Sequence, residues 1–349
     1  MLFKNANIFV GGQFQHGSFR VENGKFAEIL TTVPAEDGID LNNQYVIPGL
    51  VDVHNHGNSG ADFSDGDYDG LVKMARYLAQ NGVTSFAPAS MTLPYDVLEA
   101  AYKTAVQLKK AQPEGCARLI GIQMEGPFFS EKKKGAQNGA YLRLPDFEAF
   151  KRLYDVSEGL IRIADVAAEL PGAVGFAEKA SKLCTVSIAH TDCTYEEASA
   201  VLDAGASHLT HLYNAMPSIH HRKPGPIGAG SERENVIAEL ICDGQHIHPS
   251  AVRCAVEVSR IRTSGRSRGT TSLAAASGRH KKLRSLWLIT AARAFTSLRS
   301  ASEMCRISNS SRAARRSAMR RPVVPEEPST KILYLAIPNK PLSITAFSS

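Results

Sequence analysis

The sequence predicts an α/β protein: a (β/α)8-type TIM barrel that is incomplete at its eighth unit and follows a small N-terminal β-sandwich part. From residue 46 onward, short apolar strands alternate with amphipathic helices, as in a parallel sheet that is covered on both faces. Seven such units in series favour a barrel over an open sheet. Histidines and a glutamate stand at the predicted strand ends, where barrels of this kind carry their chemistry.

Short strands with turn residues between them occupy the first part of the chain. The segments LFKNANIFV, QFQHGSFRVENG and KFAEILT alternate apolar and polar residues and are punctuated by Gly and Asn, which predicts a small β domain over residues 1–48. Longer apolar runs follow and predict the strands of the barrel. These seven predicted strands are 46–54, 84–90, 117–124, 160–166, 185–190, 207–213 and 236–242.

Two of the connecting helices have clear boundaries. Apolar residues three and four positions apart predict a helix over 67–81 that stops at Asn81-Gly82. A second helix begins at the capping box formed by Thr194 and Glu197 and ends at Gly205. The residues predicted to share one face of the first helix are Tyr68, Leu71, Met74, Ala75 and Leu78.

The composition is that of an ordinary globular protein, with 349 residues of which 43% are hydrophobic and 21% charged. It excludes collagen-like, mucin-like and wholly disordered chains. No run approaches the ~18–20 apolar residues of a membrane span, and the N-terminus lacks a signal-peptide pattern, so we expect a cytoplasmic protein with no membrane partner. The 6 cysteines form no C-x-x-C pair, which argues against a zinc ribbon or a disulfide framework and predicts reduced, mostly buried thiols.

The charge balance changes abruptly near residue 250. Residues 1–250 contain 21 Lys and Arg against 30 Asp and Glu, whereas residues 251–349 contain 19 against 4. We therefore predict a seven-unit barrel over 49–255 and a separate basic, Ser/Arg-rich tail over 256–349. The only apolar stretches in the tail are 284–295 and 330–338, and neither occurs in a strand–helix context. The eighth unit and the strands that would return to the small β domain are thus missing from the prediction.

Five residues at four predicted strand ends carry side chains that divalent metals bind. His54 and His56 end the first barrel strand two positions apart and so point to the same side. Glu125 ends the third strand, His190 ends the fifth and His211 lies in the sixth. Imidazoles with one carboxylate suit zinc, and iron, cobalt or manganese accept the same ligands. A lone histidine is more often an ordinary core or surface residue, but five ligand-type residues at four strand ends disfavour that interpretation.

Nearby polar residues are assigned ordinary structural roles. The aspartates interpreted as turn residues or as supports for the ligands are Asp52, Asp62, Asp65 and Asp192. The histidines whose spacing indicates no metal site are His208, His220 and His248.

Several motifs closely resemble those of the N-acetylglucosamine-6-phosphate deacetylases of the amidohydrolase superfamily: Y-V-I-P-G-L-V-D-V-H-N-H-G, M-E-G-P-F-F, H-T-D, H-L-Y-N-A-M-P and D-G-Q-H. Many amidohydrolases share H-x-H, whereas the combination of E-G-P-F, K-K-G-A-Q-N, H-L-Y-N-A-M and D-G-x-H is more specific to the deacetylases. The resemblance covers about residues 1–255 and then stops. It implies metal-dependent hydrolysis of the N-acetyl amide of N-acetylglucosamine 6-phosphate to glucosamine 6-phosphate and acetate.

The same resemblance implies roles for particular residues. Glu125, His190 and His211 would hold one divalent ion, and His54 and His56 would hold a second ion in members that keep H-x-H. Such an ion polarises the amide carbonyl and lowers the pKa of a water molecule to about 7. The implied substrate contacts are Ala136 and Gln137 at the amide, Asn214 and Ala215 on the substrate, His246 near the sugar, and Arg222, from the neighbouring subunit of a homodimer, at the 6-phosphate. An arginine fork suits a phosphate, although the run H-H-R-K also fits a solvated loop.

One part of the family pattern is absent. Family members end the eighth strand with an S-D motif, whose Asp takes a proton from the metal-bound water and passes it to the leaving amine, and this step needs a carboxylate within hydrogen-bond reach. No Asp follows Asp243, and the remaining glutamates lie in no comparable motif. No catalytic acid or base is therefore identified, and we expect metal binding with weak or absent turnover.

Three explanations of residues 256–349 remain open: a basic nucleic-acid-binding appendage, a replacement eighth unit, or a change of reading frame near residue 255. We favour the frame change because the resemblance, the periodicity and the aspartates all end together. Translation of the other two frames of the gene from codon 250 tests this hypothesis.

Two alternative functions also remain open. The first is another amidohydrolase, acting on N-acetylgalactosamine 6-phosphate or on a cyclic amide. The second is a non-enzymatic metal-binding protein whose basic tail binds nucleic acid, and we rank it lower because few aromatic residues accompany the basic ones there.

Overall fold

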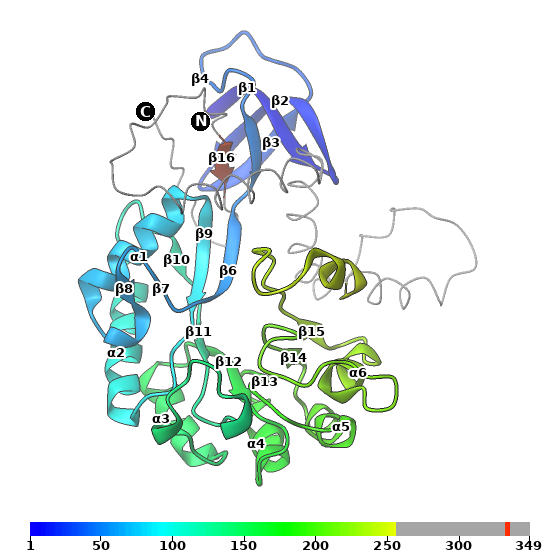
Figure 1. Cartoon of the computed structure of the whole chain (residues 1–349). Coiled ribbons are helices and arrows are strands. Elements are labelled where there is room, and N and C mark those ends of the chain that lie inside the picture. Colours follow the sequence, from blue (N-terminus) through cyan, green and yellow to red (C-terminus); the bar gives the residue numbers. More distant parts are fainter. Residues whose placement is uncertain (256–331, 336–349) are drawn as a thin grey trace, which may run out of the picture. The chain divides into compact units, whose positions relative to one another are not determined.

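The computed structural model describes residues 1–255 and 332–335. This part of the chain divides into two compact units between Leu50 and Val51, and the C-terminal strand belongs to the first unit (Figure 1). The strands are β1 (Leu2–Val10), β2 (Gln13–Glu22), β3 (Lys25–Leu30), β4 (Ile39–Asp40), β5 (Tyr45–Pro48), β6 (Leu50–Asn55), β7 (Gly57–Asn58), β8 (Ala61–Asp62), β9 (Val83–Pro88), β10 (Arg118–Leu119), β11 (Ile122–Met124), β12 (Ile161–Val166), β13 (Thr185–Ile188), β14 (His208–Leu209), β15 (Ile237–Ala238) and β16 (Ile332–Leu335). The helices are η1 (Phe63–Asp65), α1 (Tyr68–Gln80), α2 (Tyr95–Ala111), η2 (Glu131–Lys133), η3 (Gly139–Tyr141), α3 (Phe147–Val156), α4 (Ala173–Ala180), α5 (Tyr195–Asp203) and α6 (Gly225–Ser231).

The first unit is a sheet in the order β16-β5-β1-β2-β3, with β4 paired to β1. The three segments predicted as strands at the N-terminus form β1, β2 and β3, which pair antiparallel as consecutive hairpins. Phe3 and Phe19 stack at 4.9 Å between ring centroids and are fully buried with Ala6 in a small core. All the described strands of this unit lie in one sheet, so its closure into a sandwich stays a prediction.

Strand β16 corrects the interpretation of the C-terminal apolar stretch. Residues 332–335 lie within 330–338, for which the sequence indicated no strand, yet they pair parallel with β5 from Ile332 opposite Tyr45 to Leu335 opposite Pro48. We expected all the strands that would return to the small β domain to be missing, and β16 shows that this expectation is wrong for one of them. The error arose because the stretch was judged by its neighbours along the chain, whereas a sheet partner can come from any distance. The stretch 284–295 lies outside the described residues.

The second unit contains six of the seven strands predicted for the barrel and part of the first, all parallel where their pairing is recorded. The segment predicted as the first strand, 46–54, is two strands: β5 pairs with β1 in the sheet of the first unit, and β6 belongs to the second unit. The segment predicted as one strand over 117–124 is two, β10 and β11. The break occurs because Ile120 N–H donates to Phe86 on β9, whereas Ile122 N–H donates to Leu160 beside β12, so the chain changes its partner there. Within the described ranges 1–255 and 332–335, the recorded parallel pairs join β9 with β10 and β11 through β15, and a barrel that is incomplete at its eighth unit stays a prediction.

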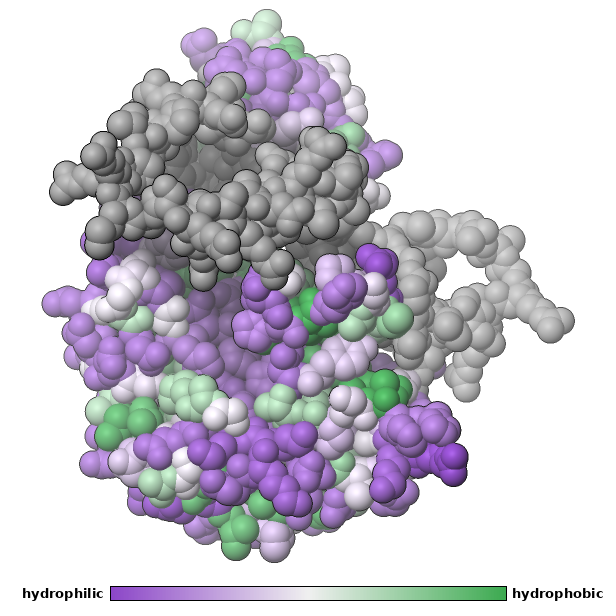
Figure 2. Space-filling model, in the orientation of Figure 1, coloured by the Kyte–Doolittle hydropathy of each residue, from purple (hydrophilic) through white to green (hydrophobic). Residues whose placement is uncertain are grey.

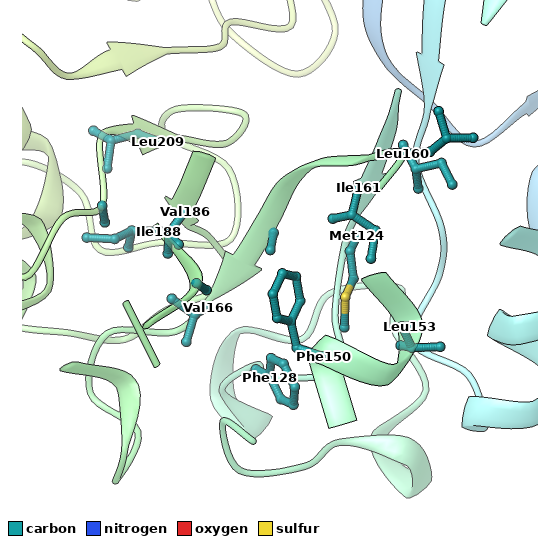
Figure 3. Close-up of a cluster of buried hydrophobic side chains, with 14 of the residues drawn as sticks. Met124, Phe128, Phe150, Leu153, Leu160, Ile161, Val166, Val186, Ile188 and Leu209 are labelled. Carbon is teal, nitrogen blue, oxygen red and sulfur yellow. The ribbon is translucent and has the colours of Figure 1, made fainter. Parts of the chain in front are cut away.

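Helices lie outside the strands of the second unit and bury apolar faces against them. The predicted helix 67–81 is α1, capped by Asp67 and ended at Asn81, and it buries four of the five residues predicted for its face. The second predicted helix is α5, and both hydrogen bonds of its Thr194–Glu197 capping box are present. Figure 3 shows the core that this packing creates around Phe128, Phe150 and the strand residues. This core holds the strand ends in fixed positions.

The described surface seen in Figure 2 is mostly hydrophilic, with small separate apolar patches. Among the described residues, no helix combines the length and the hydropathy needed to span a membrane. The five described cysteines are free thiols, as predicted. Cys116 and Cys193 are buried, whereas Cys242 and Cys254 are exposed, so the prediction that most of the thiols are buried is wrong for these two. Cys305 lies outside the described residues.

Candidate metal centre and active site

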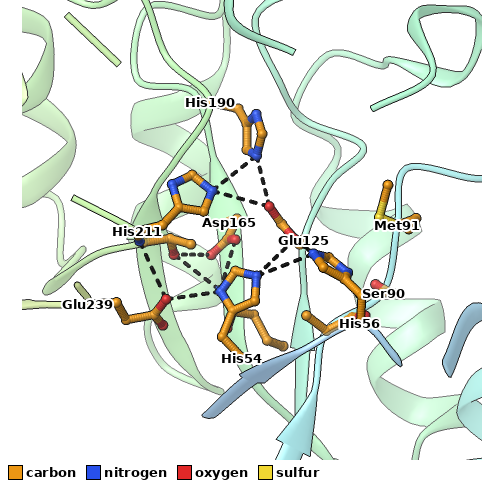
Figure 4. A network of polar contacts seen from close by, with 12 residues as sticks. His54, His56, Ser90, Met91, Glu125, Asp165, His190, His211 and Glu239 are labelled. Carbon is orange, nitrogen blue, oxygen red and sulfur yellow. Dashed lines mark hydrogen bonds and ion pairs between the residues drawn. The ribbon is translucent and has the colours of Figure 1, made fainter. Parts of the chain in front are cut away.

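Glu125 lies at the centre of a group of four imidazoles (Figure 4). It follows β11, and only 2% of its side chain is exposed. Its Oε1 lies 2.8 Å from Nε2 of His190 and 3.3 Å from Nε2 of His211. Its Oε2 lies 3.2 Å from Nε2 of His54 and 2.8 Å from Nε2 of His56. One carboxylate thus faces two pairs of imidazole nitrogens, one pair on each oxygen.

These contacts define two groups of three possible ligands that share Glu125. In each group the three ligand atoms lie within 4.8 Å of one another. The Nε2 atoms are 3.1 Å apart in the pair His190–His211 and 3.4 Å apart in the pair His54–His56. Nitrogen and carboxylate oxygen at this spacing match the preferences of zinc and related divalent cations. The donor set can therefore hold two such ions with Glu125 between them.

The Nδ1 atoms of three of these histidines contact acceptors that orient the rings. His56 Nδ1 lies 3.1 Å from the Ala89 carbonyl, and His190 Nδ1 lies 2.9 Å from the Lys133 carbonyl. His54 Nδ1 lies 3.0 Å from a carboxylate oxygen of Glu239. An acceptor at Nδ1 keeps a proton on that nitrogen and turns Nε2 toward the centre, where Nε2 can offer its lone pair to a cation once it carries no proton of its own.

Backbone conformation also marks this centre. His190 and His211 have φ angles of +44° and +34°, in the left-handed region that residues with a Cβ rarely adopt. Such strain persists only where the surroundings enforce it, and it concentrates at functional sites. Each residue comes two positions after the end of a strand, β13 or β14, and the unusual φ accompanies the turn of each side chain toward Glu125.

The residue after Glu125 must be a glycine. Gly126 has a φ of +96°, and a Cβ added there would lie 2.1 Å from the hydroxyl oxygen of Thr92. A glycine therefore allows the chain to turn after Glu125 without displacing the neighbouring loop.

Gly126→Ala is expected to lower the free energy of unfolding by about 1–3 kcal/mol, because it adds strain at positive φ to a steric clash. Urea unfolding measures this change. Gly175→Ala is the matched control, because Gly175 lies in helix α4 and an added Cβ would meet nothing within 4 Å. This control should be neutral or stabilising by up to about 1 kcal/mol, and equal losses in the two variants would contradict the assignment.

The charges of the centre are strongly coupled. Burial alone would raise the pKa of Glu125, but hydrogen bonds from the four histidines outweigh burial and hold this pKa well below its usual range. Burial opposes the charged form of His54, yet its hydrogen bonds with Glu125 and Glu239 raise its pKa to about 11. His54 therefore carries a proton between two carboxylates, and binding of a cation through its Nε2 must release that proton.

Sequence reasoning missed two carboxyl groups, Glu239 and Asp165. Both lie inside segments predicted as strands, 236–242 and 160–166, as single carboxylates in apolar runs, so the sequence carried no local signal that marked them. Asp165 accepts hydrogen bonds from Gln123 Nε2 at 3.1 Å and from the Thr210 hydroxyl at 3.0 Å. Burial, together with the charges of Glu125 and Glu239, raises the pKa of Asp165 to about 8. A protonated carboxyl group thus lies near the candidate metal ligands at neutral pH.

Asp165→Asn is expected to reduce the pH dependence of stability in the metal-free protein. Between the ordinary pKa of 3.8 and the folded value of about 8, the folded chain keeps a proton that the unfolded chain has released. The free energy of unfolding should therefore fall as the pH rises across this window, by up to about 1.4 kcal/mol per pH unit from this group. Urea unfolding of chelator-treated wild type and variant from pH 4 to pH 8 measures it. A stability difference that does not change with pH would count against this prediction.

The residues assigned structural roles have partners of the expected kind. Asp62 and Asp65 form the capping box of the short helix η1. Asp192 pairs with Lys132 at 3.3 Å. Asp52 accepts from the backbone N–H of His54 at 3.1 Å and so supports a candidate ligand. His208 is a buried histidine whose Nδ1 lies 2.9 Å from the Ser187 hydroxyl.

The residues predicted to contact substrate are distributed unevenly. The loop that carries Ala136 and Gln137 packs on His190, since a Cβ at Gly135 would lie 3.7 Å from that ring. Gln137 is buried and accepts from Thr92 N–H at 2.7 Å, whereas Ala136 is exposed.

The other four predicted contacts follow β14 and β15. Asn214 is half-buried and donates to the His211 carbonyl at 3.3 Å, and the Ala215 carbonyl accepts from Thr191 N–H at 3.0 Å. Arg222 and His246 are exposed, and their side chains bond to His221 and Asp243 respectively. The structure thus brings Asn214 and Ala215 close to the ligand segments, while the recorded bonds of Arg222 and His246 lie within their own loops.

Comparison with known proteins identifies the family. The profile described as the amidohydrolase family matches residues 45–321. The chain belongs to the amidohydrolase family. This amidohydrolase is 35% identical over 263 residues to the N-acetylglucosamine-6-phosphate deacetylase of Bacillus subtilis (strain 168), which covers 73% of this chain and 66% of that protein. It is also 34% identical over 221 residues to the N-acetylgalactosamine-6-phosphate deacetylase of Escherichia coli O157:H7, covering 62% of this chain and 58% of that protein. The chain spans about two thirds or less of these relatives.

Solved structures agree with this family. The crystal structure of N-acetyl-D-glucosamine-6-phosphate deacetylase from Mycobacterium smegmatis superposes with a TM-score of 0.69 at 28% identity, covering 74% of this amidohydrolase and 68% of that chain. A variant of the same mycobacterial protein, solved in complex with N-acetyl-D-glucosamine-6-phosphate, gives a TM-score of 0.68 at 27% identity, with the same coverage. The α/β architecture of the second unit is thus shared with the deacetylases.

Proposed function

We propose that this chain is a metal-dependent amide hydrolase that converts N-acetylglucosamine 6-phosphate to glucosamine 6-phosphate and acetate. The observation that carries the proposal is the Glu125 carboxylate with two imidazole nitrogens on each oxygen, within 2.8 to 3.3 Å. The similarity to deacetylases over 73% of the chain supports the choice of substrate. The same similarity favours an amino-sugar phosphate over a cyclic amide.

The residues present suit a divalent ion. Glu125, His190 and His211 would hold one ion, and His54, His56 and Glu125 a second, with zinc the preferred metal and iron, cobalt or manganese as alternatives. A divalent ion bound there supplies Lewis-acid chemistry, which polarises the amide carbonyl and acidifies water. The chain itself orients the imidazoles through the acceptors at Nδ1 and keeps the carboxylate largely away from solvent.

Substrate contacts form a second part of the proposal. Gln137 and Ala136 would line the amide beside His190, and Asn214 and Ala215 would contact the substrate. His246 would bond near the sugar, and Arg222 from the neighbouring subunit of a homodimer would bind the 6-phosphate, for which a guanidinium fork is well suited. The exposure of Arg222 and His246 in the single chain is compatible with a site that a second copy completes.

Proton transfer is the step for which the sequence supplies no residue. The deacetylase pattern places it on an aspartate at the end of the eighth strand, and no aspartate follows Asp243. We therefore propose that the chain binds metal and substrate but turns over weakly or not at all. A change of reading frame near residue 255 remains our hypothesis for this loss.

The domain scheme belongs to the same proposal. It comprises a small β-sandwich domain over 1–48, a barrel that lacks its eighth unit over 49–255, and a basic tail over 256–349, of which residues 332–335 pair with β5 of the first unit. Cytoplasmic location and the absence of a nucleic-acid partner are expectations of this scheme.

Metal analysis of the purified chain combined with acetate release from a panel of acetylated amino-sugar phosphates tests the function. We expect bound divalent metal, and any release to be fastest with N-acetylglucosamine 6-phosphate. Faster release from N-acetylgalactosamine 6-phosphate would instead favour the specificity of the E. coli relative. Bound metal without acetate release from any member of the panel, together with nucleic-acid binding that weakens steeply with salt, would favour the non-enzymatic metal-binding alternative.

A further inference from the structure

We propose that Glu239 is a positioning residue for the second ion: it accepts the Nδ1 proton of His54 and thereby directs Nε2 of His54 at the ion held with His56 and Glu125. This inference rests on the proposed function and deepens it. Glu239 comes directly after β15, and 10% of its side chain is exposed. Its Oε2 lies 3.0 Å from His54 Nδ1, on the side of the ring opposite the nitrogen that faces Glu125 (Figure 4).

The backbone fixes Glu239 in place. Its N–H donates to the Leu209 carbonyl at 3.0 Å, and its carbonyl accepts from Leu212 N–H at 2.8 Å. Both partners belong to the segment that carries His211. The carboxylate therefore reaches His54 from a rigid ladder and does not depend on a mobile loop.

Glu239 also connects the two groups of ligands. The same Oε2 that contacts His54 lies 3.4 Å from the backbone N–H of His211. His54 belongs to one group and His211 to the other. Glu239 thus sets the position of the His54 ring relative to the segment that carries the other ion.

A carboxylate differs from the acceptors of the neighbouring histidines. His56 and His190 use the neutral carbonyls of Ala89 and Lys133. A charged acceptor at Nδ1 makes an imidazole a stronger ligand through its other nitrogen, and loss of such a partner typically weakens metal affinity about 10–100-fold. Glu239 does not take the place of the missing proton carrier, because its carboxylate contacts Nδ1 of His54, the ring nitrogen that points away from the centre.

The experiment compares three variants of the full chain with wild type after removal of metal by a chelator. Glu239→Leu removes the acceptor at similar volume, Glu239→Gln keeps a neutral acceptor, and Asp165→Asn is the control, a buried carboxyl group whose recorded bonds go to Gln123 and Thr210. Titration with Co²⁺ gives the number of ions, their affinities and the visible absorption of each bound ion. Thermal unfolding reports whether each variant is folded.

We expect wild type and Asp165→Asn to bind two Co²⁺ ions. In Glu239→Leu the affinity for the second ion should fall about 10–100-fold with a changed absorption band, while the first ion stays unaffected. Glu239→Gln should be intermediate. If Glu239→Leu fails to fold, the glutamine variant decides the question through the affinity and absorption of its second ion.

Wild-type affinity and absorption for both ions in the folded Glu239 variants would overturn the inference. An equal fall in the affinities of both ions would also overturn it, because it would indicate a general structural effect. So would a wild type that binds only one ion, if Glu239→Leu binds that ion with the same affinity. In each of these results wild type binds at least one ion, which distinguishes them from failure of the proposed function, in which wild type binds no ion at all.

Discussion

Glu125→Gln is expected to abolish binding of both metal ions. The variant keeps the volume of the side chain but removes the only carboxylate that both ligand groups share, so neither group retains a negative ligand. We expect the affinity of each ion to fall by more than about 100-fold, beyond the range seen when a residue that only supports a ligand is lost. Equilibrium dialysis with zinc, followed by elemental analysis, measures both ions.

Glu99→Gln is a suitable control for this substitution. Glu99 lies on α2 and pairs with Arg152 at 2.9 Å, away from the histidines. This variant should bind metal as wild type does. Retention of one ion at normal affinity by Glu125→Gln would show that Glu125 is not shared, and retention of both would refute the metal centre as described.

Restoring the eighth unit is expected to raise turnover about 10²–10⁴-fold, which is the usual contribution of a positioned acid or base. The change is a chimera in which residues 256–349 are replaced by the C-terminal segment of the Bacillus subtilis relative. The reason is that, by the family pattern, the replacement would supply the aspartate of the S-D motif, which no residue after Asp243 provides in this chain. Acetate release from N-acetylglucosamine 6-phosphate measures kcat for both proteins.

The matched control is the same chimera with the S-D aspartate changed to asparagine, which should remain as slow as the original chain. If the original chain already turned over at the ordinary rates of enzymes, about 1–10³ per second, the proposed impairment would be refuted. A chimera that binds metal and folds but stays slow would show that the missing aspartate is not the cause.

The order of the strands could be predicted because apolar runs and turn residues are local signals. Every predicted barrel strand has a counterpart between β5 and β15, and the caps at Asp67 and Thr194 define α1 and α5. The break between β10 and β11 could not be predicted, because it depends on which neighbour each backbone group bonds to. Pairing of β16 with β5 was missed for the same reason.

The candidate ligands could be chosen from the sequence because strand ends in a barrel converge on one side. The structure brings the side chains of His54, His56, Glu125, His190 and His211 to one place, though their role as ligands remains a prediction. Glu239 and Asp165 were missed because a single carboxylate in an apolar run carries no local mark of its partner. Their contacts are made across the sheet, to residues far away in the sequence.

The return of β16 to β5 has a consequence for biosynthesis. Ile332 pairs with Tyr45, so an N-terminal strand emerges from the ribosome long before its partner is made. Closing so long a loop has an entropic cost and slows the assembly of such distant contacts. During translation, the β5 edge of the first sheet is therefore left unprotected until residues 332–335 have been synthesised, and a chaperone would be most useful in that interval.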